Sequence, residues 1–315
     1  MNNQPRNNRN ASIIGVVVAL AVVAAILAVV LLNRESPPPA ASQSASASPS
    51  AGASLNQELL SQRLTVLVIG TDSSQARRAQ GLNTINTDSM ILASISADQS
   101  QVTLISLPRD TVDVPLPDGS TWSSKINALE AAQGVDALVG AFSELFGVKI
   151  DGYVQVDMDG LVALVDAVGG VTVNPAQPLS DPKVDLDIPA GEQHLDGATA
   201  LKYVRTRVDM DYGRDARQQE VILQLVAGLV SPQADVDVAG LLNGLDKLET
   251  DLPIGDLPTL IEIGRRAQNA TVTRQVLQPP EFISFEGDRG DGRGYVLEPN
   301  IEAIRAFAQE HIGTD

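Results

Sequence analysis

Short apolar runs alternate with stretches of helical spacing along most of the chain. Runs rich in β-branched residues predict buried strands at 64–70, 89–96, 102–107, 153–156, 171–173 and 271–277. Apolar residues three or four positions apart predict helices at 124–134, 136–146, 161–168, 196–203, 215–230, 236–248, 258–270 and 301–311. Because strands and helices are interleaved, the pattern indicates an α/β fold built in layers.

The longest apolar run, residues 13–32, lies near the N-terminus and carries no charge. With a rise of about 1.5 Å per residue, a helix of this length spans roughly 30 Å, the thickness of the hydrocarbon core of a bilayer. The alternative is a cleaved signal peptide with a small-residue site at 45–47, but the apolar region of such a peptide usually has only about 7–15 residues. We therefore expect one uncleaved transmembrane helix.

The charges that flank this run predict its orientation. Arg6 and Arg9 precede it, whereas one basic and one acidic residue follow it and cancel. The positive-inside rule then places residues 1–12 in the cytoplasm and the rest outside the cell membrane. Residues 33–54 are mainly Pro, Ala, Ser and Gly, which predicts a linker because they bury too little apolar area to fold. Residues 55–315 form the expected extracytoplasmic domain, in a single-pass protein.

Composition excludes several kinds of function. The chain contains no cysteine, so it has no disulfides, no cysteine nucleophile and no thiolate metal site. A net charge of −17 argues against binding of nucleic acid, because phosphate backbones are bound by clustered basic residues. Seventeen of the 22 basic residues are arginines, and the positions of these arginines are more informative than the net charge.

Two aspartates stand at the ends of neighbouring predicted strands. Asp72 follows the first strand, and Asp88 opens the second. An aspartate at a strand end often serves only to cap a turn, which is the alternative for each residue alone. If the two strands pair, both carboxylates reach one place. A pair of oxygen ligands suits Mg²⁺ or Mn²⁺, with water and phosphate oxygens completing the coordination, so we predict Asp72 and Asp88 as metal ligands.

The third predicted strand ends at Pro108, which has no N–H to continue the pairing. Arg109 and Asp110 follow directly. An arginine at such a turn is either a surface charge or, if it lies beside Asp72 and Asp88, a partner for a phosphate group.

The densest basic segment contains Arg205, Arg207, Arg214 and Arg217, followed by Gln218. Arg205 and Arg207 would face the same way on an extended chain, and Arg214 and Arg217 share a face at the start of a predicted helix. Guanidinium groups bind phosphate through paired hydrogen bonds, and helix N-termini attract anions, so the segment predicts an anion site with Gln218 as a further donor. The alternative is a network of ion pairs between these arginines and Asp209, Asp211 and Asp215.

In this order along the chain, the motifs resemble those of the LytR-CpsA-Psr family of bacterial cell-envelope proteins. The resemblance extends from about Leu64 to the C-terminal end. Each segment alone is weak, but the ordered set is highly specific. The segments are GTD (70–72), NTDSM (86–90), LPRD (107–110), KINA (125–128), YV (153–154), VDAVGGV (165–171), HLDG (194–197), ALKYVRTR (200–207), DYGR (211–214) and RQQ (217–219).

The resemblance implies an α/β/α sandwich with a central mixed sheet and a lipid-binding tunnel. It also implies an enzyme: a Mg-dependent phosphotransferase that moves an anionic glycopolymer, such as teichoic acid, from a polyprenyl-pyrophosphate carrier to peptidoglycan. The reaction would form a phosphodiester and release polyprenyl phosphate. The implied partners are the lipid-linked glycan, peptidoglycan and the membrane, and the implied process is cell-wall biogenesis.

The candidate residues fit this activity. The pyrophosphate would meet positive charge and hydrogen-bond donors from Arg109, Arg205, Arg207, Arg214, Arg217 and Gln218, while Asp72 and Asp88 hold the metal. The expected catalytic residues are Arg109, Asp88 and Asp110. A hydroxyl on carbon 6 of N-acetylmuramic acid would attack the sugar-side phosphate. Either Asp88 or Asp110 would take the proton of this hydroxyl. Two alternatives stay open: a hydrolase that uses water as acceptor, and a non-catalytic module that binds the wall lipid.

A prenyl chain would need an apolar channel. Two predicted helices carry apolar stripes that fit this need, although such stripes more often belong to an ordinary core. The stripes consist of Leu161, Val162 and Val165 on one helix and Ile222, Leu225 and Val226 on the other.

Overall fold

The computed structural model describes residues 55–81, 85–230, 237–252 and 257–313. The expected anchor at 13–32 and the expected linker at 33–54 lie outside these residues. Within the described part of the chain, no helix is both long enough and apolar enough to cross a membrane.

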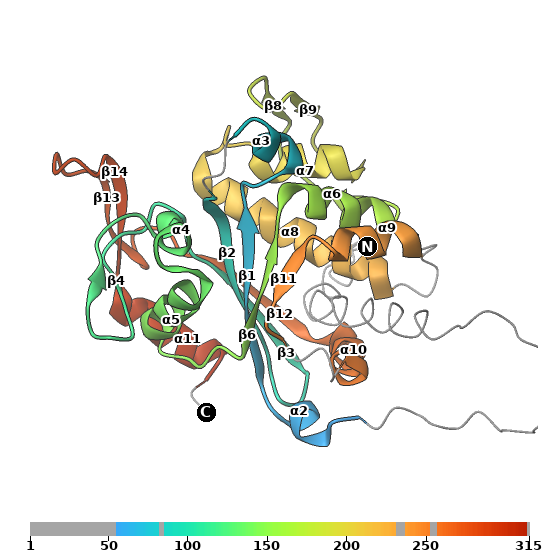
Figure 1. Cartoon of the computed structure of the whole chain (residues 1–315), viewed down its shortest axis with the longest axis horizontal. Coiled ribbons are helices and arrows are strands. Elements are labelled where there is room, and N and C mark those ends of the chain that lie inside the picture. Colours follow the sequence, from blue (N-terminus) through green and yellow to red (C-terminus); the bar gives the residue numbers. More distant parts are fainter. Residues whose placement is uncertain (1–54, 82–84, 231–236, 253–256, 314–315) are drawn as a thin grey trace, which may run out of the picture.

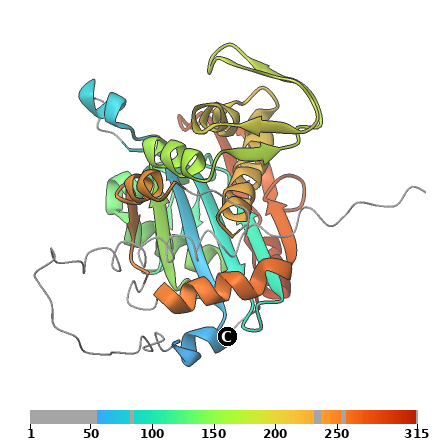
Figure 2. The ribbon, with the colours of Figure 1, turned by 90° about the vertical axis from the view of Figure 1, so that its right-hand side faces the viewer.

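A six-stranded sheet forms the centre of the fold, in the order β11, β6, β1, β2, β3, β12. The strands are β1 (Leu64–Thr71), β2 (Thr87–Ile95), β3 (Gln101–Ser106), β6 (Gly152–Val156), β11 (Leu248–Thr250) and β12 (Thr271–Val276). β1 runs parallel to β6 and antiparallel to β2, and β12 runs parallel to β3. The sheet is therefore mixed, as expected, and Figure 2 shows its strands side by side behind α6 and α9.

Helices cover both faces of this sheet, which confirms the layered α/β/α arrangement (Figure 1). One face packs against α4 (Leu129–Gln133), α5 (Val135–Phe146) and α11 (Ile301–His311). The other face carries α6 (Met158–Ala167), α7 (Gly197–Arg205), α8 (Met210–Val230), α9 (Val238–Leu245) and α10 (Leu257–Arg266).

Alternation along β1 assigns its side chains to the two layers. Leu67 and Ile69 pack with the α5 cluster, whereas Val66 and Val68 face the opposite layer. Successive residues of a strand point to opposite faces, so one continuous apolar run serves two cores. A strand that is buried on both faces explains why its sequence shows no polar alternation.

Most predicted elements are present, and the differences have local causes. The helix predicted at 124–134 is a 3₁₀ turn, η1 (Ile126–Ala128), followed by α4. The N–H of Ile126 donates to the carbonyl oxygen of Thr111 at 2.8 Å, which holds the chain before this turn in a non-helical path. The helix predicted at 236–248 ends as α9 at Leu245, because Leu248 pairs with Val156 and opens β11.

The chain also forms small elements around the sheet. Of the short strands, only β7 (Val171–Val173) was predicted, and residues 267–269 form a 3₁₀ turn at the end of the helix predicted at 258–270. The short strands pair two by two, as β4 with β5, β7 with β10, β8 with β9 and β13 with β14. Their bounds are β4 (Val114–Pro115), β5 (Thr121–Trp122), β8 (Leu179–Asp181), β9 (Leu186–Ile188), β10 (Gln193–Leu195), β13 (Ile283–Asp288) and β14 (Tyr295–Pro299), and the short helices are α2 (Gln57–Ser61), α3 (Gln75–Ala79) and η3 (Ala267–Asn269).

Candidate functional site

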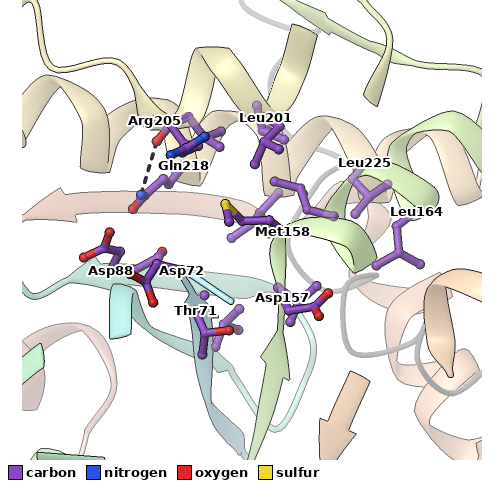
Figure 3. Close-up of a pocket in the computed structure, with 18 of the residues that line it drawn as sticks. Thr71, Asp72, Asp88, Asp157, Met158, Leu164, Leu201, Arg205, Gln218 and Leu225 are labelled. Carbon is purple, nitrogen blue, oxygen red and sulfur yellow. Dashed lines mark hydrogen bonds between the residues drawn. The ribbon is translucent and has the colours of Figure 1, made fainter. Parts of the chain in front are cut away.

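A cavity of about 220 Å³ lies between the sheet and the helices α6, α7 and α8. Apolar side chains line most of it, and they come from the sheet and from all three helices. Figure 3 shows Leu164 and Leu225 at one end of this cavity and Asp72 and Asp88 at the other. The apolar lining consists of Val68, Val154, Val156, Met158, Leu161, Leu164, Leu201, Val204, Val221, Ile222, Leu225, Val226 and Leu248.

The predicted apolar stripes are confirmed in part as a cavity lining. Leu161, Ile222, Leu225 and Val226 line the cavity. Val162 and Val165 do not, and Val165 is completely buried in the neighbouring core.

The polar mouth of the cavity lies where β1 ends and β2 begins. The two strands pair as expected, and their register shifts between Gly70 and Thr71. A Cβ on Gly70 would lie only 2.9 Å from the Cβ of Ser89, so glycine permits this close approach. Asp72 and Asp88 consequently both line the same cavity.

Hydrogen bonds hold Asp72 in place. Its Oδ1 accepts from the backbone N–H of Asn86 at 2.9 Å, and its Oδ2 accepts from Arg77 Nη2 at 3.1 Å. Arg77 comes from α3 and also lines the cavity, a contribution that the sequence did not suggest because α3 is a five-residue polar helix. The only available signal was Ser74, whose side chain caps this helix.

Arg109 joins the same mouth from the turn after β3. Its Nη1 donates to Asp88 Oδ1 at 2.6 Å, and its Nε lies 3.8 Å from Asp110 Oδ2. Burial alone would lower the pKa of the Arg109 guanidinium, but the nearby charges of Asp88 and Asp110 outweigh burial and raise it. Asp110 in turn lies 2.7 Å from Lys125 Nζ, so Arg109 stays charged within a connected set of ions.

Arg207 brings a second positive charge close to Asp88. Its Nη2 lies 3.8 Å from Asp88 Oδ2, and its Nε lies 3.3 Å from Asp211 Oδ1. Burial and the neighbouring charges of Arg109 and Arg214 lower the pKa of Arg207. Three arginines are therefore close enough to repel one another, and a bound anion would relieve that repulsion.

Arg205 lies at the last position of α7 and lines the cavity. The expectation that Arg205 and Arg207 share one extended segment is wrong, because Arg205 still belongs to the helix. Among the described residues Arg205 has no carboxylate within ion-pair distance. Gln218 lies next to it, and its Nε2 donates to the carbonyl oxygen of Val204 at 3.4 Å (Figure 3).

Arg214 and Arg217 are buried, with 2% and 5% of their surface exposed. Arg214 forms ion pairs with Asp211 at 2.6 Å and with Asp215 at 2.8 Å. Arg217 Nη1 lies 2.5 Å from Asp209 Oδ2. The ion-pair network that was the alternative interpretation is therefore present around these two arginines, and their contact with a phosphate stays a prediction.

The backbone contacts of Arg217 give it a structural task as well. Its Nε donates to the carbonyl oxygen of Tyr203 at 2.9 Å, and its Nη2 donates to that of Thr206 at 2.5 Å. These carbonyls belong to the C-terminal turn of α7 and to the residue after it, where helical carbonyls have no helical partner. Arg217 therefore holds the segment that carries Arg205 and Arg207.

Asp215 has the most strongly perturbed carboxylate of this network. Burial raises its pKa to about 6, although the charge of Arg214 acts in the opposite direction. Its Oδ2 is buried without a hydrogen-bond partner among the described residues. This carboxylate therefore supports Arg214 at a cost in desolvation.

The two carboxylates at the mouth fit a hard divalent cation. In the described part of the chain, no group of three or more His, Cys, Asp or Glu side chains is placed to hold a metal. Mg²⁺ commonly binds through only one or two carboxylates and takes its remaining ligands from phosphate and water. Asp72 and Asp88 supply that donor set beside the cavity.

An apolar cavity that ends in arginines and aspartates suits an amphipathic anion. The apolar part of such a ligand would occupy the cavity, and its charged part would meet Arg205, which lines it, and Arg109 and Arg207, which contact Asp88. The fold and the site thus define a class of α/β protein in which an apolar pocket opens beside arginines and aspartates. The chain belongs to the LytR_cpsA_psr family, whose model matches residues 35–306.

Relatives and solved structures agree with this assignment. The chain is 30% identical over 259 residues to biofilm regulatory protein A of Streptococcus mutans. This match covers 77% of this chain but only 61% of that protein. It is 31% identical over 258 residues to the polyisoprenyl-teichoic acid–peptidoglycan teichoic acid transferase TagU of Enterococcus faecalis. This match covers 79% of this chain and 80% of that protein. The crystal structure of Bacillus subtilis TagV matches with a TM-score of 0.64 at 23% identity, over 81% of this chain and 99% of that one.

Proposed function

We propose that this protein transfers an anionic glycopolymer from a polyprenyl-pyrophosphate carrier to peptidoglycan. The observation that carries the proposal is an apolar cavity lined at one end by Arg205 and Asp88, with Arg109 and Arg207 in contact with Asp88. A polyprenyl pyrophosphate has the same division into an apolar chain and a charged head. The name of the Enterococcus faecalis relative, a teichoic acid transferase acting between a polyisoprenyl carrier and peptidoglycan, supports the same reaction.

In the proposed reaction, a sugar hydroxyl of peptidoglycan attacks the phosphorus that carries the glycopolymer. A new P–O bond forms to this hydroxyl oxygen, the bridging P–O bond breaks, and polyprenyl phosphate leaves. Arg109, Arg205 and Arg207 stabilise the charge on the phosphoryl oxygens and on the leaving group. The hydroxyl proton passes to Asp88 or Asp110, the two carboxylates nearest to Arg109.

Asp72 and Asp88 are the proposed ligands for Mg²⁺ or Mn²⁺. When bound, the cation polarises the phosphoryl group and neutralises charge on the leaving phosphate. The existing hydrogen bonds from Asn86 and Arg77 orient Asp72 toward the mouth. The cavity between α6 and α8 serves as the lipid tunnel, and the expected anchor at residues 13–32 holds the site at the outer face of the membrane.

The test uses the full-length chain in detergent micelles. It receives a polyprenyl-pyrophosphate glycan, Mg²⁺ and peptidoglycan fragments, and both released polyprenyl phosphate and joined product are measured. We expect joined product that disappears with a chelator and with Arg109→Ala. Arg265→Ala is the matched control, because Arg265 is an exposed arginine of α10 that pairs with Glu262.

Other outcomes would favour other functions. Release of polyprenyl phosphate without joined product would indicate a hydrolase. Tight binding of the lipid without either product, across several glycans, would indicate a binding module. In both cases the transferase proposal is wrong.

A further inference from the structure

The β13–β14 hairpin is joined by its backbone to the turn that carries Arg109 and Asp110. The N–H of Leu297 donates to the carbonyl oxygen of Asp110 at 3.1 Å, and the N–H of Val112 donates to that of Leu297 at 2.9 Å. Figure 1 shows the hairpin standing apart from the central sheet, on the side of β4 and α4. The hairpin therefore adjoins the turn that carries Arg109 and Asp110, and none of its residues lines the cavity.

One face of this hairpin presents a carboxylate between two tyrosines. Glu286 lies opposite Leu297, and Tyr295 lies diagonally across the pair of strands on the same face. The hydroxyl of Tyr295 donates to Glu286 Oε1, and the hydroxyl of Tyr212 donates to Glu286 Oε2 at 3.2 Å. Tyr212 comes from the first turn of α8, directly after Asp211. The cluster thus connects the hairpin to the helix that carries Arg214 and Gln218.

The Tyr295 ring is 44% exposed although its hydroxyl is fixed. Within the described ranges, four large hydrophobic side chains are more than a third exposed, and three of them adjoin a residue of the mouth in sequence. Ile85 precedes Asn86, Val208 follows Arg207, and Met210 precedes Asp211. Three of the exposed apolar side chains are thus next in sequence to Arg207 or to residues that contact Asp72 or Arg207.

We propose that Tyr295, Glu286 and Tyr212 form the subsite for the acceptor sugar, an inference that rests on the proposed transferase function. A pyranose ring has a flat face of C–H bonds and an edge of hydroxyl groups. The face of Tyr295 offers apolar contact with little loss of conformational freedom. An ionised carboxylate has about four acceptor positions, and the two tyrosines occupy two of them, so Glu286 can still accept from sugar hydroxyls.

The protonation states of the cluster suit this task. Burial and the neighbouring Glu286 raise the pKa of both Tyr212 and Tyr295 above the ordinary value for tyrosine, so both rings stay neutral and donate. The charges of Asp211 and Asp110 also act on Tyr295. Asp110 lies 3.8 Å from Arg109 through its side chain and accepts from the N–H of Leu297 through its backbone, so it connects the hairpin with Arg109.

The test measures acceptor kinetics with the full-length chain and peptidoglycan glycan fragments. Tyr295→Ala should raise the KM for the acceptor at least tenfold and leave the affinity for the lipid donor unchanged. Tyr295→Phe, which keeps the ring, should recover most of the acceptor affinity. Glu286→Gln should raise the acceptor KM severalfold. The matched control is Glu298→Gln, because Glu298 lies on the same hairpin and pairs with Arg289 on its other face.

Calorimetric binding of the same soluble glycan, without lipid donor, separates this inference from the proposed function. If wild-type protein joins no product but binds the glycan, and Tyr295→Ala weakens that binding at least tenfold, the subsite stands without the transferase. If wild-type protein transfers normally and Tyr295→Ala leaves the acceptor KM unchanged, the subsite is wrong and the transferase stands. Absence of any glycan binding by wild-type protein, or an equal loss in Glu298→Gln, would also overturn the subsite.

Discussion

The two faces of the central sheet are built from the same strands and have different uses. Toward α5 and α11, side chains such as Leu67 and Ile69 pack into a cluster that includes Phe142 and Phe146. Toward α6 and α8, Val68 and Gly70 border the cavity. The four charged residues that are buried in the described part of the chain, Asp181, Arg214, Asp215 and Arg217, all lie in β8 and α8, on the cavity side. Both faces bury large apolar clusters, but the cavity and the buried charges lie on one face only.

This difference teaches how one strand serves both purposes. Its alternation sends large residues to the packed face and smaller ones to the face that needs room. A mutation on β1 or its neighbours should therefore affect either folding or function, according to the face on which it lies. The following predictions test that separation.

The largest effect is expected from Phe142→Ala on the packed face. Phe142 is completely buried and stacks on Phe146, with ring centroids 5.6 Å apart. Loss of the ring leaves a cavity, which should lower the free energy of unfolding by about 3–5 kcal/mol. Denaturant unfolding measures this change, and the turnover of the remaining folded protein should be unaffected. A loss of turnover without loss of stability would contradict the separation of the two faces.

Arg109→Ala should have the converse effect on the cavity side. Removing a charged donor aimed at the reacting phosphate typically lowers the catalytic rate about 10²–10³-fold. Arg109 is partly exposed and its main partner is Asp88, so unfolding in denaturant should change by only about 1 kcal/mol. The steady-state transfer rate and the free energy of unfolding are measured on the same preparation. A loss of stability as large as that of Phe142→Ala would contradict the prediction.

The next effect concerns the pH dependence of stability. Burial raises the pKa of Asp215 to about 6, from about 3.9 in an unfolded chain. A raised pKa means that the contribution of Asp215 is fully present below about pH 4 and is lost as the pH rises through about 6. Wild-type protein should therefore lose stability relative to Asp215→Asn between pH 4 and pH 7, by at most about 3 kcal/mol. Parallel curves for the two proteins over that range would show that Asp215 does not titrate there.

The smallest effect is expected from Ile222→Trp, which fills the cavity. Ile222 lines the cavity from α8, so a larger ring should occupy the space of the prenyl chain. Affinity for polyprenyl phosphate should fall about tenfold, equivalent to about 1.4 kcal/mol. Affinity for inorganic pyrophosphate, which has no apolar tail, is the control and should stay the same. An equal fall for both ligands would indicate that the substitution distorts the mouth.

The sequence predicts several elements of the central layers well because the hydrophobic pattern of each extends over many residues. β1, β3, β12 and α11 lie close to their expected bounds, since many residues contribute to each pattern. The hairpins β8–β9 and β13–β14 were not predicted. The strands of the first have only three residues each, and those of the second contain few apolar residues among charged ones and a glycine. Their pairing depends on turns that contain few apolar residues.

The candidate site was predictable by residue type more than by geometry. The meeting of Asp72 with Asp88 followed from the pairing of β1 with β2. The sequence did not predict that Arg214 is buried and paired with Asp211 and Asp215. Several arginines and aspartates are close together in this segment, and the sequence does not show which of them pair. The acceptor cluster was not predictable either, because Tyr212 and Glu286 are 74 residues apart in sequence.

The hydrogen bonds of Arg217 determine whether the segment with Arg205 and Arg207 becomes ordered on folding or only on binding. Its guanidinium donates to the carbonyls of Tyr203 and Thr206, so these contacts come from the chain itself, and its burial shields them from dissolved salt. The segment with Arg205 and Arg207 is therefore ordered when the protein folds. The conformational entropy of that segment is lost on folding, so contacts with the proposed pyrophosphate substrate would contribute their free energy to binding and to the transition state.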